Sequence, residues 1–160
     1  MSPHLTEPDG NAIVYCDGAF NTTNGKTAHG LVRFTDRYNV LSVIDARWNG
    51  WDAGELLDGK PNGIPICRNL EEALEKARDE YRSVTHFVIG LAPDGGRLTD
   101  SDREAVIAAL QAGLNVDSGL HDFLSEDRRM AALAKRRGVR IRDIRKPPDR
   151  HALHFFTGAI

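Results

Sequence analysis

Six short apolar runs alternate along this chain with segments of helical periodicity. The runs cover residues 12–16, 40–44, 64–67, 86–89, 114–117 and 139–144. Runs of this length, bounded by glycine, proline and polar residues, are typical of buried strands. Because strand and helix alternate, the pattern predicts an α/β fold: a three-layer α/β/α sandwich around a mostly parallel sheet of about six strands.

The segments between these runs predict four helices. One covers 26–34. A second begins at Asn69, where Glu72 completes a capping-box pattern, and its apolar periodicity continues to Tyr81. A third is capped by Thr99 and ends near residue 113, and a fourth covers about 125–138. The segment 47–63 is rich in glycine, tryptophan and proline and is predicted to be irregular. Pro65 places its strand near a sheet edge.

Composition narrows the class of protein. The chain has 160 residues, 41% hydrophobic and 28% charged, which fits one folded domain and argues against disorder. No apolar run is long enough to span a membrane, and the first residues lack a signal-peptide pattern, so a cytoplasmic location is expected. The net charge of −2 disfavours a nucleic-acid partner. Cys16 and Cys67 fall inside apolar runs, which favours a reduced, buried pair over a disulfide or a metal site.

Polar and small residues follow several strands, where an open α/β sheet places its ligand crevice. Asp17 follows the first strand, and Gly25, Lys26 and Thr27 stand where the first helix begins. The spacing fails the P-loop pattern, because six residues rather than four separate Gly18 from Gly25. Two interpretations stay open: an anion site at the helix N-terminus, or a simple helix start with an exposed lysine.

The second strand ends at Asp45, where a carboxylate could accept hydrogen bonds from ribose hydroxyls. It could equally cap the loop that follows. The glycine fingerprint of dinucleotide-binding domains is missing after the first strand, and this disfavours a nicotinamide cofactor.

Two further clusters follow the fourth and fifth strands. Pro93, Gly95 and Gly96 allow close approach of a ligand to the backbone, or form a plain turn. Ser118, Gly119 and His121 combine a hydroxyl, a flexible residue and an imidazole. His121 could act as a general base or ligand contact, or cap the helix near Ser125.

Several segments together resemble one known family. They are 25–33 (GKTAHGLVR), 63–66 (GIPI) with 70–73 (LEEA), 88–96 (VIGLAPDGG), 118–124 (SGLHDFL) and 142–148 (RDIRKPP). In order and separation they resemble the N-terminal Rossmann-like domain of the D-glutamate N-acetyltransferase-like family. The resemblance implies a domain over 12–148, followed by a linker (149–160) towards a C-terminal P-loop domain. Residues 1–11 are polar with two prolines and are predicted to be a flexible tail. The apolar end of the chain agrees with that continuation.

The resemblance implies transfer of an acetyl group from acetyl-CoA to the amine of D-glutamate. A looser likeness to the CoA-binding domain of succinyl-CoA synthetases points to the same class of ligand. In this interpretation His121 is the candidate base, and Lys26 with the backbone at Gly95, Gly96 and Gly119 faces the anionic groups. The expected partners are the P-loop domain of the same protein and a possible homo-oligomer. The competing hypotheses are a non-catalytic packing module and a nicotinamide-dependent oxidoreductase.

Overall fold

A computed structural model describes residues 8–147 of the chain. The predicted linker 149–160 and most of the predicted tail 1–11 lie outside this range. The end of that tail was wrong, because Gly10 and Asn11 belong to the first strand. The sheet consists of β1 (Gly10–Tyr15), β2 (Tyr38–Ile44), β3 (Ile66–Cys67), β4 (His86–Ile89), β5 (Asn115–Ser118) and β6 (Ile141–Asp143). The helices are α1 (Lys26–Arg33), α2 (Ala53–Asp58), α3 (Leu70–Asp79), α4 (Asp100–Gln111) and α5 (Arg128–Arg137). Four 3₁₀ turns lie in the connections: η1 (Thr23–Gly25), η2 (Ala46–Trp48), η3 (Asp94–Gly96) and η4 (Leu124–Glu126).

The six strands form one sheet in the order β3-β2-β1-β4-β5-β6, and every neighbouring pair is parallel. This confirms the predicted α/β class with a Rossmann-like strand order. β3 lies at an edge, as Pro65 predicted. The chain winds outward in opposite directions from β1 and β4, so a topological switch point lies between these two central strands.

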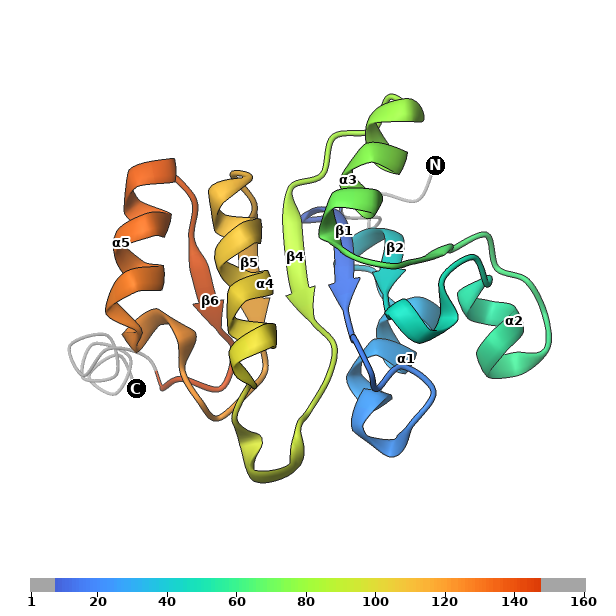
Figure 1. Cartoon of the computed structure of the whole chain (residues 1–160), viewed down its shortest axis with the longest axis horizontal. Coiled ribbons are helices and arrows are strands. Elements are labelled where there is room, and N and C mark those ends of the chain that lie inside the picture. Colours follow the sequence, from blue (N-terminus) through green and yellow to red (C-terminus); the bar gives the residue numbers. More distant parts are fainter. Residues whose placement is uncertain (1–7, 148–160) are drawn as a thin grey trace, which may run out of the picture.

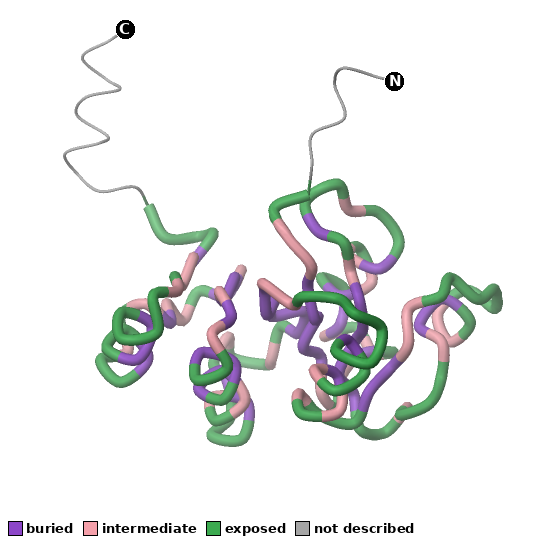
Figure 2. Tube along the Cα trace, turned by 90° about the horizontal axis from the view of Figure 1, so that it is seen from above, coloured by how far each residue is buried: buried purple, intermediate pink, exposed green. Residues whose placement is uncertain are grey.

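The helices form the outer layers (Figure 1). α3, α4 and α5 lie along the near face of the sheet in this view, and α4 contacts β5. α1 lies behind the sheet, against β1 and β2, with α2 packed beside it. α1 also contacts the end of β4, where Leu31 packs against the cluster of Val88. Among the described residues no helix covers the far side of β5 and β6. Buried residues concentrate in the strands at the centre, and the outer turns of the helices are exposed (Figure 2).

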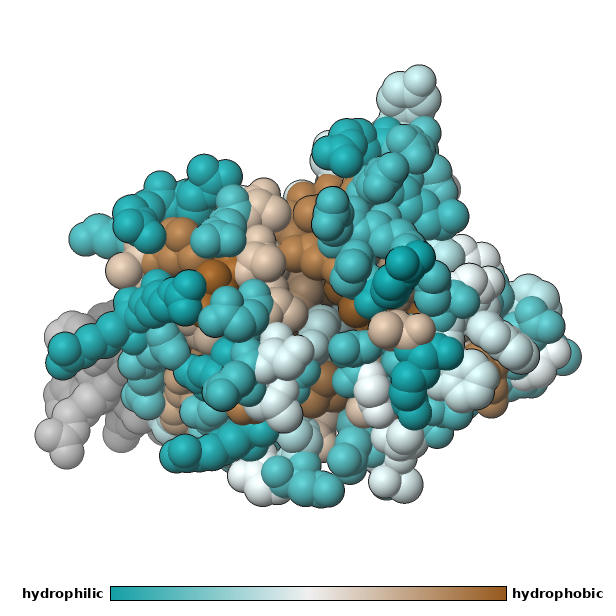
Figure 3. Space-filling model, in the orientation of Figure 1, coloured by the Kyte–Doolittle hydropathy of each residue, from teal (hydrophilic) through white to brown (hydrophobic). Residues whose placement is uncertain are grey.

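The central strands are buried on both sides, as continuous apolar runs in parallel sheets require. Ile13, Val14 and Phe87 have almost no exposed surface, and they belong to the same core cluster as Val106 and Leu110 of α4. On the near face, hydrophilic side chains cover the outer sides of the helices, while apolar atoms remain visible in the hollow between α3 and α4 (Figure 3).

Helix α2 corrects the prediction that segment 47–63 is irregular. Asp52 caps this short helix by accepting a hydrogen bond from the Glu55 N–H (3.0 Å). Gly59 ends it in the left-handed conformation (φ 74°). The sequence did not predict this helix, because its two capping residues stand among tryptophans, glycines and prolines, which usually disfavour a helix.

Two helix boundaries also differ from the prediction. α3 ends at Asp79, and Tyr81 lies beyond it with φ 56° and 98% of its surface exposed. The prediction that the apolar face of this helix extends to Tyr81 was therefore wrong. Near Ser125 the chain first forms the turn η4, and Asp127 then caps α5 by accepting from the Met130 N–H (3.0 Å). Cys16 and Cys67 are both buried and free, as predicted.

Candidate functional site

The carboxyl ends of β1, β4 and β5 meet at one rim of the sheet, beside the switch point. The loop after β1 leads through η1 into α1, the loop after β4 contains η3, and the loop after β5 leads to η4. The residues that the sequence singled out as a candidate site lie in these loops, at the ends of β2 and β5 or at the start of α1.

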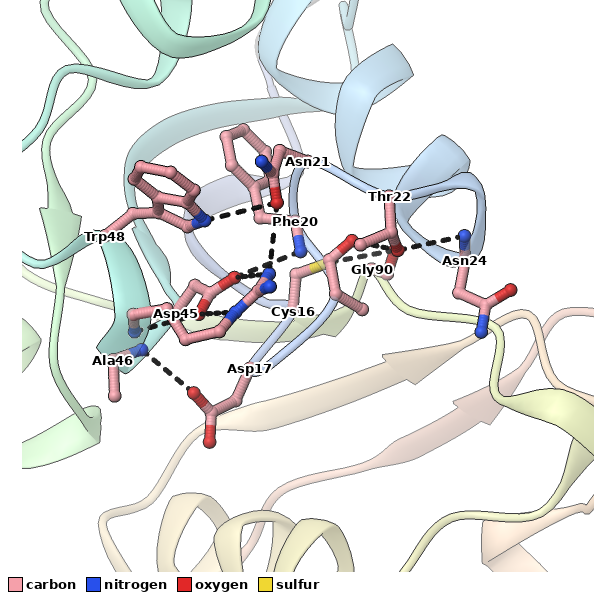
Figure 4. A network of polar contacts seen from close by, with 12 residues as sticks. Cys16, Asp17, Phe20, Asn21, Thr22, Asn24, Asp45, Ala46, Trp48 and Gly90 are labelled. Atoms are coloured by element: carbon pink, nitrogen blue, oxygen red, sulfur yellow. Dashed lines mark hydrogen bonds and ion pairs between the residues drawn. The ribbon is translucent and has the colours of Figure 1, made fainter.

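Asp45 fixes the loop after β1 (Figure 4). Its carboxylate is fully buried and accepts hydrogen bonds from the Phe20 N–H (3.1 Å) and the Arg47 N–H (3.1 Å). The Arg47 guanidinium adds an ion pair at 2.8 Å. Asp45 therefore caps η2 and ties the β1–α1 loop to the end of β2. Because both oxygens are occupied and buried, the arrangement is that of a capping carboxylate rather than of a ribose acceptor.

Asp17 and Asn21 extend the same network towards η2. The Asp17 carboxylate accepts from the Ala46 N–H (2.9 Å), and the Asn21 side-chain oxygen accepts from the Trp48 indole (3.1 Å) and from Arg47 (3.1 Å) (Figure 4). The loop thus has a defined conformation through contacts that join two strand ends.

α1 and the end of β4 approach each other closely at Gly90. A Cβ on Gly90 would lie 2.6 Å from Val14 Cγ1 and 2.8 Å from Ala28 Cβ. The Ala28 N–H donates to the Gly90 carbonyl (3.0 Å), and the Ala92 N–H donates to the Asn24 carbonyl (2.8 Å). The start of α1 is therefore hydrogen-bonded to the strand across the switch point.

Gly25 lies at the N-cap of α1 and is buried. A Cβ at this position would lie 2.4 Å from the Ala19 carbonyl oxygen and 2.6 Å from that of Phe20, so only glycine fits. Lys26 and Thr27 follow it and are exposed at the rim. The lysine is thus accessible, as both interpretations of this motif expected.

The loop after β4 turns at Gly95 (φ 79°) and Gly96 (φ 75°), with Pro93 as the residue before η3. Both glycines adopt a conformation that other residues rarely adopt, so the turn by itself requires them. The Asn24 side chain donates to Asp94 (3.4 Å), which brings this turn towards the β1–α1 loop.

After β5, Ser118 is buried and its hydroxyl accepts from the Leu120 N–H (3.2 Å). The Gly119 carbonyl accepts a hydrogen bond from the Arg145 guanidinium. His121 is exposed. The helix cap that sequence offered as its alternative role belongs to Asp127 instead.

A groove of about 320 Å³ runs beside α1 over the far side of the sheet. Its volume is in the range of small-molecule sites. Two of the residues predicted from the sequence, Thr27 and Gly119, line this groove at the end nearest the carboxyl rim of the sheet, which is called its rim end below. The complete lining comprises Thr27, Leu31, Thr35, Arg37, Tyr38, Val88, Ile89, Asp117, Gly119 and Ile144. Two larger cavities, of about 450 and 360 Å³, lie beside β2 and the 50–65 segment and contain none of the predicted residues.

Asp117 is the feature of this groove that sequence reasoning missed. Its side chain is fully buried, accepts a hydrogen bond from the Tyr38 hydroxyl and pairs with the Arg142 guanidinium at 2.9 Å. Burial, together with the bond to Asp117, raises the pKa of Tyr38 to about 12, so this hydroxyl remains a neutral donor. Asp117 could have been identified from the sequence as a charged residue inside an apolar run that is predicted to be a strand.

Two buried residues at the end of β1, Tyr15 and Cys16, have raised pKa values. Burial raises the pKa of the Cys16 thiol to about 12, so Cys16 is not a thiolate nucleophile at neutral pH. The Tyr15 hydroxyl donates to Asp102 (2.6 Å), and burial with this bond raises the pKa of Tyr15 far above its usual value. This contact ties β1 to the first turn of α4, where Thr99 and Asp102 form a capping box.

Over residues 8–147, no three histidine, cysteine, aspartate or glutamate side chains cluster as metal ligands would. No helix in that range is long and apolar enough to cross a membrane.

Comparison with known proteins assigns a family. Residues 46–147 match a Rossmann-like domain of unknown function, DUF1611_N. This chain belongs to the DUF1611_N family. The match covers more than half of the chain and includes η3, β5, β6 and every candidate residue from Pro93 onward.

Relatives of this DUF1611_N domain are longer proteins. A D-glutamate N-acetyltransferase of Tritonibacter scottomollicae is 35% identical over 88 residues, which cover 52% of this chain and 26% of that protein. A DUF1611 family protein of Anabaena variabilis has a crystal structure that is 30% identical, with a TM-score of 0.75 over 89% of this chain and 39% of that one. An amine dehydrogenase of Mycobacterium smegmatis shares the fold at 22% identity and a TM-score of 0.56, covering 86% of this chain and 40% of its own. The chain therefore spans about a quarter to two fifths of these relatives.

Proposed function

We propose that this domain supplies a ligand crevice to an acetyl-transfer enzyme of the D-glutamate N-acetyltransferase type. The ligand would be the CoA or nucleotide portion of acetyl-CoA, or the amino-acid acceptor. The observation that carries the proposal is the groove whose rim end joins Thr27 and Gly119 beside the switch point. The named acetyltransferase among its relatives supports the same class of reaction. Catalysis would belong to the longer protein, together with a C-terminal P-loop domain as partner.

The groove has a lining that suits an acyl-CoA as substrate. Leu31, Val88 and Ile144 give it apolar walls for a pantetheine-like arm, and Arg37 stands in its lining as a cation for phosphate groups. Lys26, exposed beside Thr27, adds a second positive charge at the rim.

In acetyl transfer, an amine attacks the thioester carbonyl. The reaction needs a base for the ammonium and donors for the developing oxyanion. His121, exposed after β5, is the proposed base. Backbone N–H groups around Gly95, Gly96 and Gly119 are the proposed donors.

Two other functions make different predictions. A nicotinamide oxidoreductase would need a free acceptor at the end of β2, whereas Asp45 is buried in contacts with Phe20 and Arg47. A non-catalytic packing module is favoured by the far side of β5 and β6, which no described helix covers. Such a module would bind none of the small ligands.

Calorimetry of this chain with acetyl-CoA, CoA, ATP, NAD and D-glutamate tests the proposal. We expect acetyl-CoA or D-glutamate to bind. Gly119→Phe should lower the affinity about tenfold or more, and a tenfold loss corresponds to about 1.4 kcal/mol of binding free energy. A Cβ on Gly119 meets no atom within 4 Å, so the phenyl ring fills the groove without straining the backbone. Ala131→Phe, on the exposed side of α5, is the control. Silence for every ligand would favour the packing module, and binding of NAD alone would favour the oxidoreductase.

A further inference from the structure

The end of α3 carries an exposed tyrosine in a strained backbone conformation. Tyr81 is the only non-glycine residue with a positive φ (56°) in residues 8–147. Its N–H donates to the Arg78 carbonyl (3.0 Å), and the next N–H, of Arg82, donates to the Ala77 carbonyl (2.8 Å). In this type of helix end the position of Tyr81 usually belongs to glycine, because any other side chain costs free energy there.

Nothing within the described part of the chain offsets the cost of this tyrosine. Its surface is 98% exposed, so the ring packs against no described residue. The end of α3 also stands out from the body of the molecule (Figure 1). Strained residues of this kind are retained where a function depends on them, and an exposed tyrosine is well suited to contact another protein.

A cavity of about 450 Å³ lies beside this tyrosine. Glu80 and Arg82, the chain neighbours of Tyr81, both line it. Trp51 also lines it with 46% of its surface exposed, and Leu41 of β2 adds apolar surface. The same surface therefore carries a projecting aromatic side chain and a hollow that could receive one.

The edge of β2 is open next to this cavity. β3 pairs with β2 at Val43 and Ile44 only, so residues 38–42 have no neighbouring strand on that side among the described residues. Leu41 lies within this open stretch and lines the cavity. An uncovered strand edge is a template for association with another chain.

The charges around the cavity have both signs. Lys76, Glu80 and Arg82 line it and are exposed, and none of them forms an ion pair with another residue of the range 8–147. A patch of one sign would repel its own copy, whereas a patch that holds both signs can pair with itself across a two-fold axis. This surface is therefore complementary to itself in charge as well as in shape.

We propose that two copies of this chain associate through this surface about a two-fold axis. Tyr81 of each copy enters the cavity of the other, beside Trp51, and Glu80 of each copy faces Arg82 of the other. The open edges of β2 then face each other. Tyrosine, tryptophan and arginine are the residue types that contribute most often to the affinity of protein interfaces. The cavity shares no residue with the groove beside α1, so this association is independent of the proposed function.

Sedimentation equilibrium of this chain tests the association. We expect a dimer, and Tyr81→Gly should raise its dissociation constant about tenfold or more, because the inserted ring is lost. The same substitution removes the strain at φ 56°. At a concentration where both proteins are monomeric, the thermal midpoint of Tyr81→Gly should therefore be no lower than that of the parent chain.

Charge reversal locates the interface. Glu80→Lys should prevent association, because the new lysine faces Arg82 of the other copy, and Arg82→Glu should prevent it by bringing two carboxylates together. Mixed in equal amounts, the two variants should form a dimer again, because each charge then meets its opposite. Arg136→Glu is the control: it lies at the exposed end of α5, on the far side of the sheet from β3, and should leave the dissociation constant unchanged.

Three results would overturn the proposal. The first is a parent chain that is still monomeric at about 1 mM, where even a weak dimer is populated. The second is a dimer that Tyr81→Gly and both charge reversals leave intact, because the association would then use another surface. The third is a mixture of the two charge variants that remains monomeric.

Discussion

Replacing Gly90 with valine is expected to cost about 3 kcal/mol of unfolding free energy, near the upper end for overpacked sites. The new Cβ would lie 2.6 Å from Val14 and 2.8 Å from Ala28, so α1 would have to move away from β4. That movement would also break the hydrogen bond from the Ala28 N–H to the Gly90 carbonyl (3.0 Å). Because whole domains have only about 5–15 kcal/mol of stability, the variant should unfold at a much lower urea concentration.

Gly30→Ala is the matched control for this effect. Gly30 lies inside α1, and a Cβ there meets no atom within 4 Å. Alanine should therefore stabilise the helix by about 0.5–1 kcal/mol. Urea unfolding followed by circular dichroism measures both changes. A Gly90→Val variant as stable as the parent chain would mean that α1 does not approach β4 as described.

Removing the Asp45 carboxylate is expected to cost about 2–3 kcal/mol. Asp45→Ala leaves the buried Phe20 N–H without its acceptor, and an unsatisfied buried donor costs about 1–3 kcal/mol. The lost ion pair adds less, because 44% of the Arg47 side chain is exposed and its guanidinium can turn to water. The β1–α1 loop should also become a site of rapid proteolysis, since the contacts that fix it are lost.

Asp58→Ala provides the comparison for Asp45. Asp58 pairs with Arg33 at 2.5 Å, but both side chains are well exposed, at 46% and 36%. Surface pairs of this kind contribute little to stability, because water and salt screen the two charges. Thermal unfolding and limited proteolysis of the two variants should differ clearly. If Asp45→Ala were no more harmful than Asp58→Ala, the loop would not depend on the buried carboxylate.

Local patterns in the sequence were sufficient to predict the sheet. The strands are continuous apolar runs, and the caps at Asn69 and Thr99 are visible as short sequence signals, so the α/β class follows from neighbouring residues alone. Helix α2 was missed although its signals are equally local. Asp52 and Gly59 mark its two ends, but they stand among residues that usually disfavour a helix.

The contacts that shape the candidate site could not be predicted, because they join residues far apart in the chain. Tyr38 of β2 reaches Asp117 of β5 across the two strands that lie between them. The small size of Gly90 matters only because Ala28 of α1 lies against it. The role of Asp45 illustrates the same limit. A carboxylate at the end of the second strand fits a ribose or a cap equally well, and only the position of the Phe20 N–H distinguishes the two.

Chemical-shift mapping shows whether ligands bind at the carboxyl rim of the sheet, beside the switch point. Acetyl-CoA and D-glutamate would be titrated separately into the ¹⁵N-labelled chain. We predict that the shifted amides fall in 18–27, 90–96 and 118–121, with a matching shift of the His121 ring signals. Shifts confined to the amino ends of the strands or to the outer sides of α3, α4 and α5, or no shift with either ligand, would contradict the account.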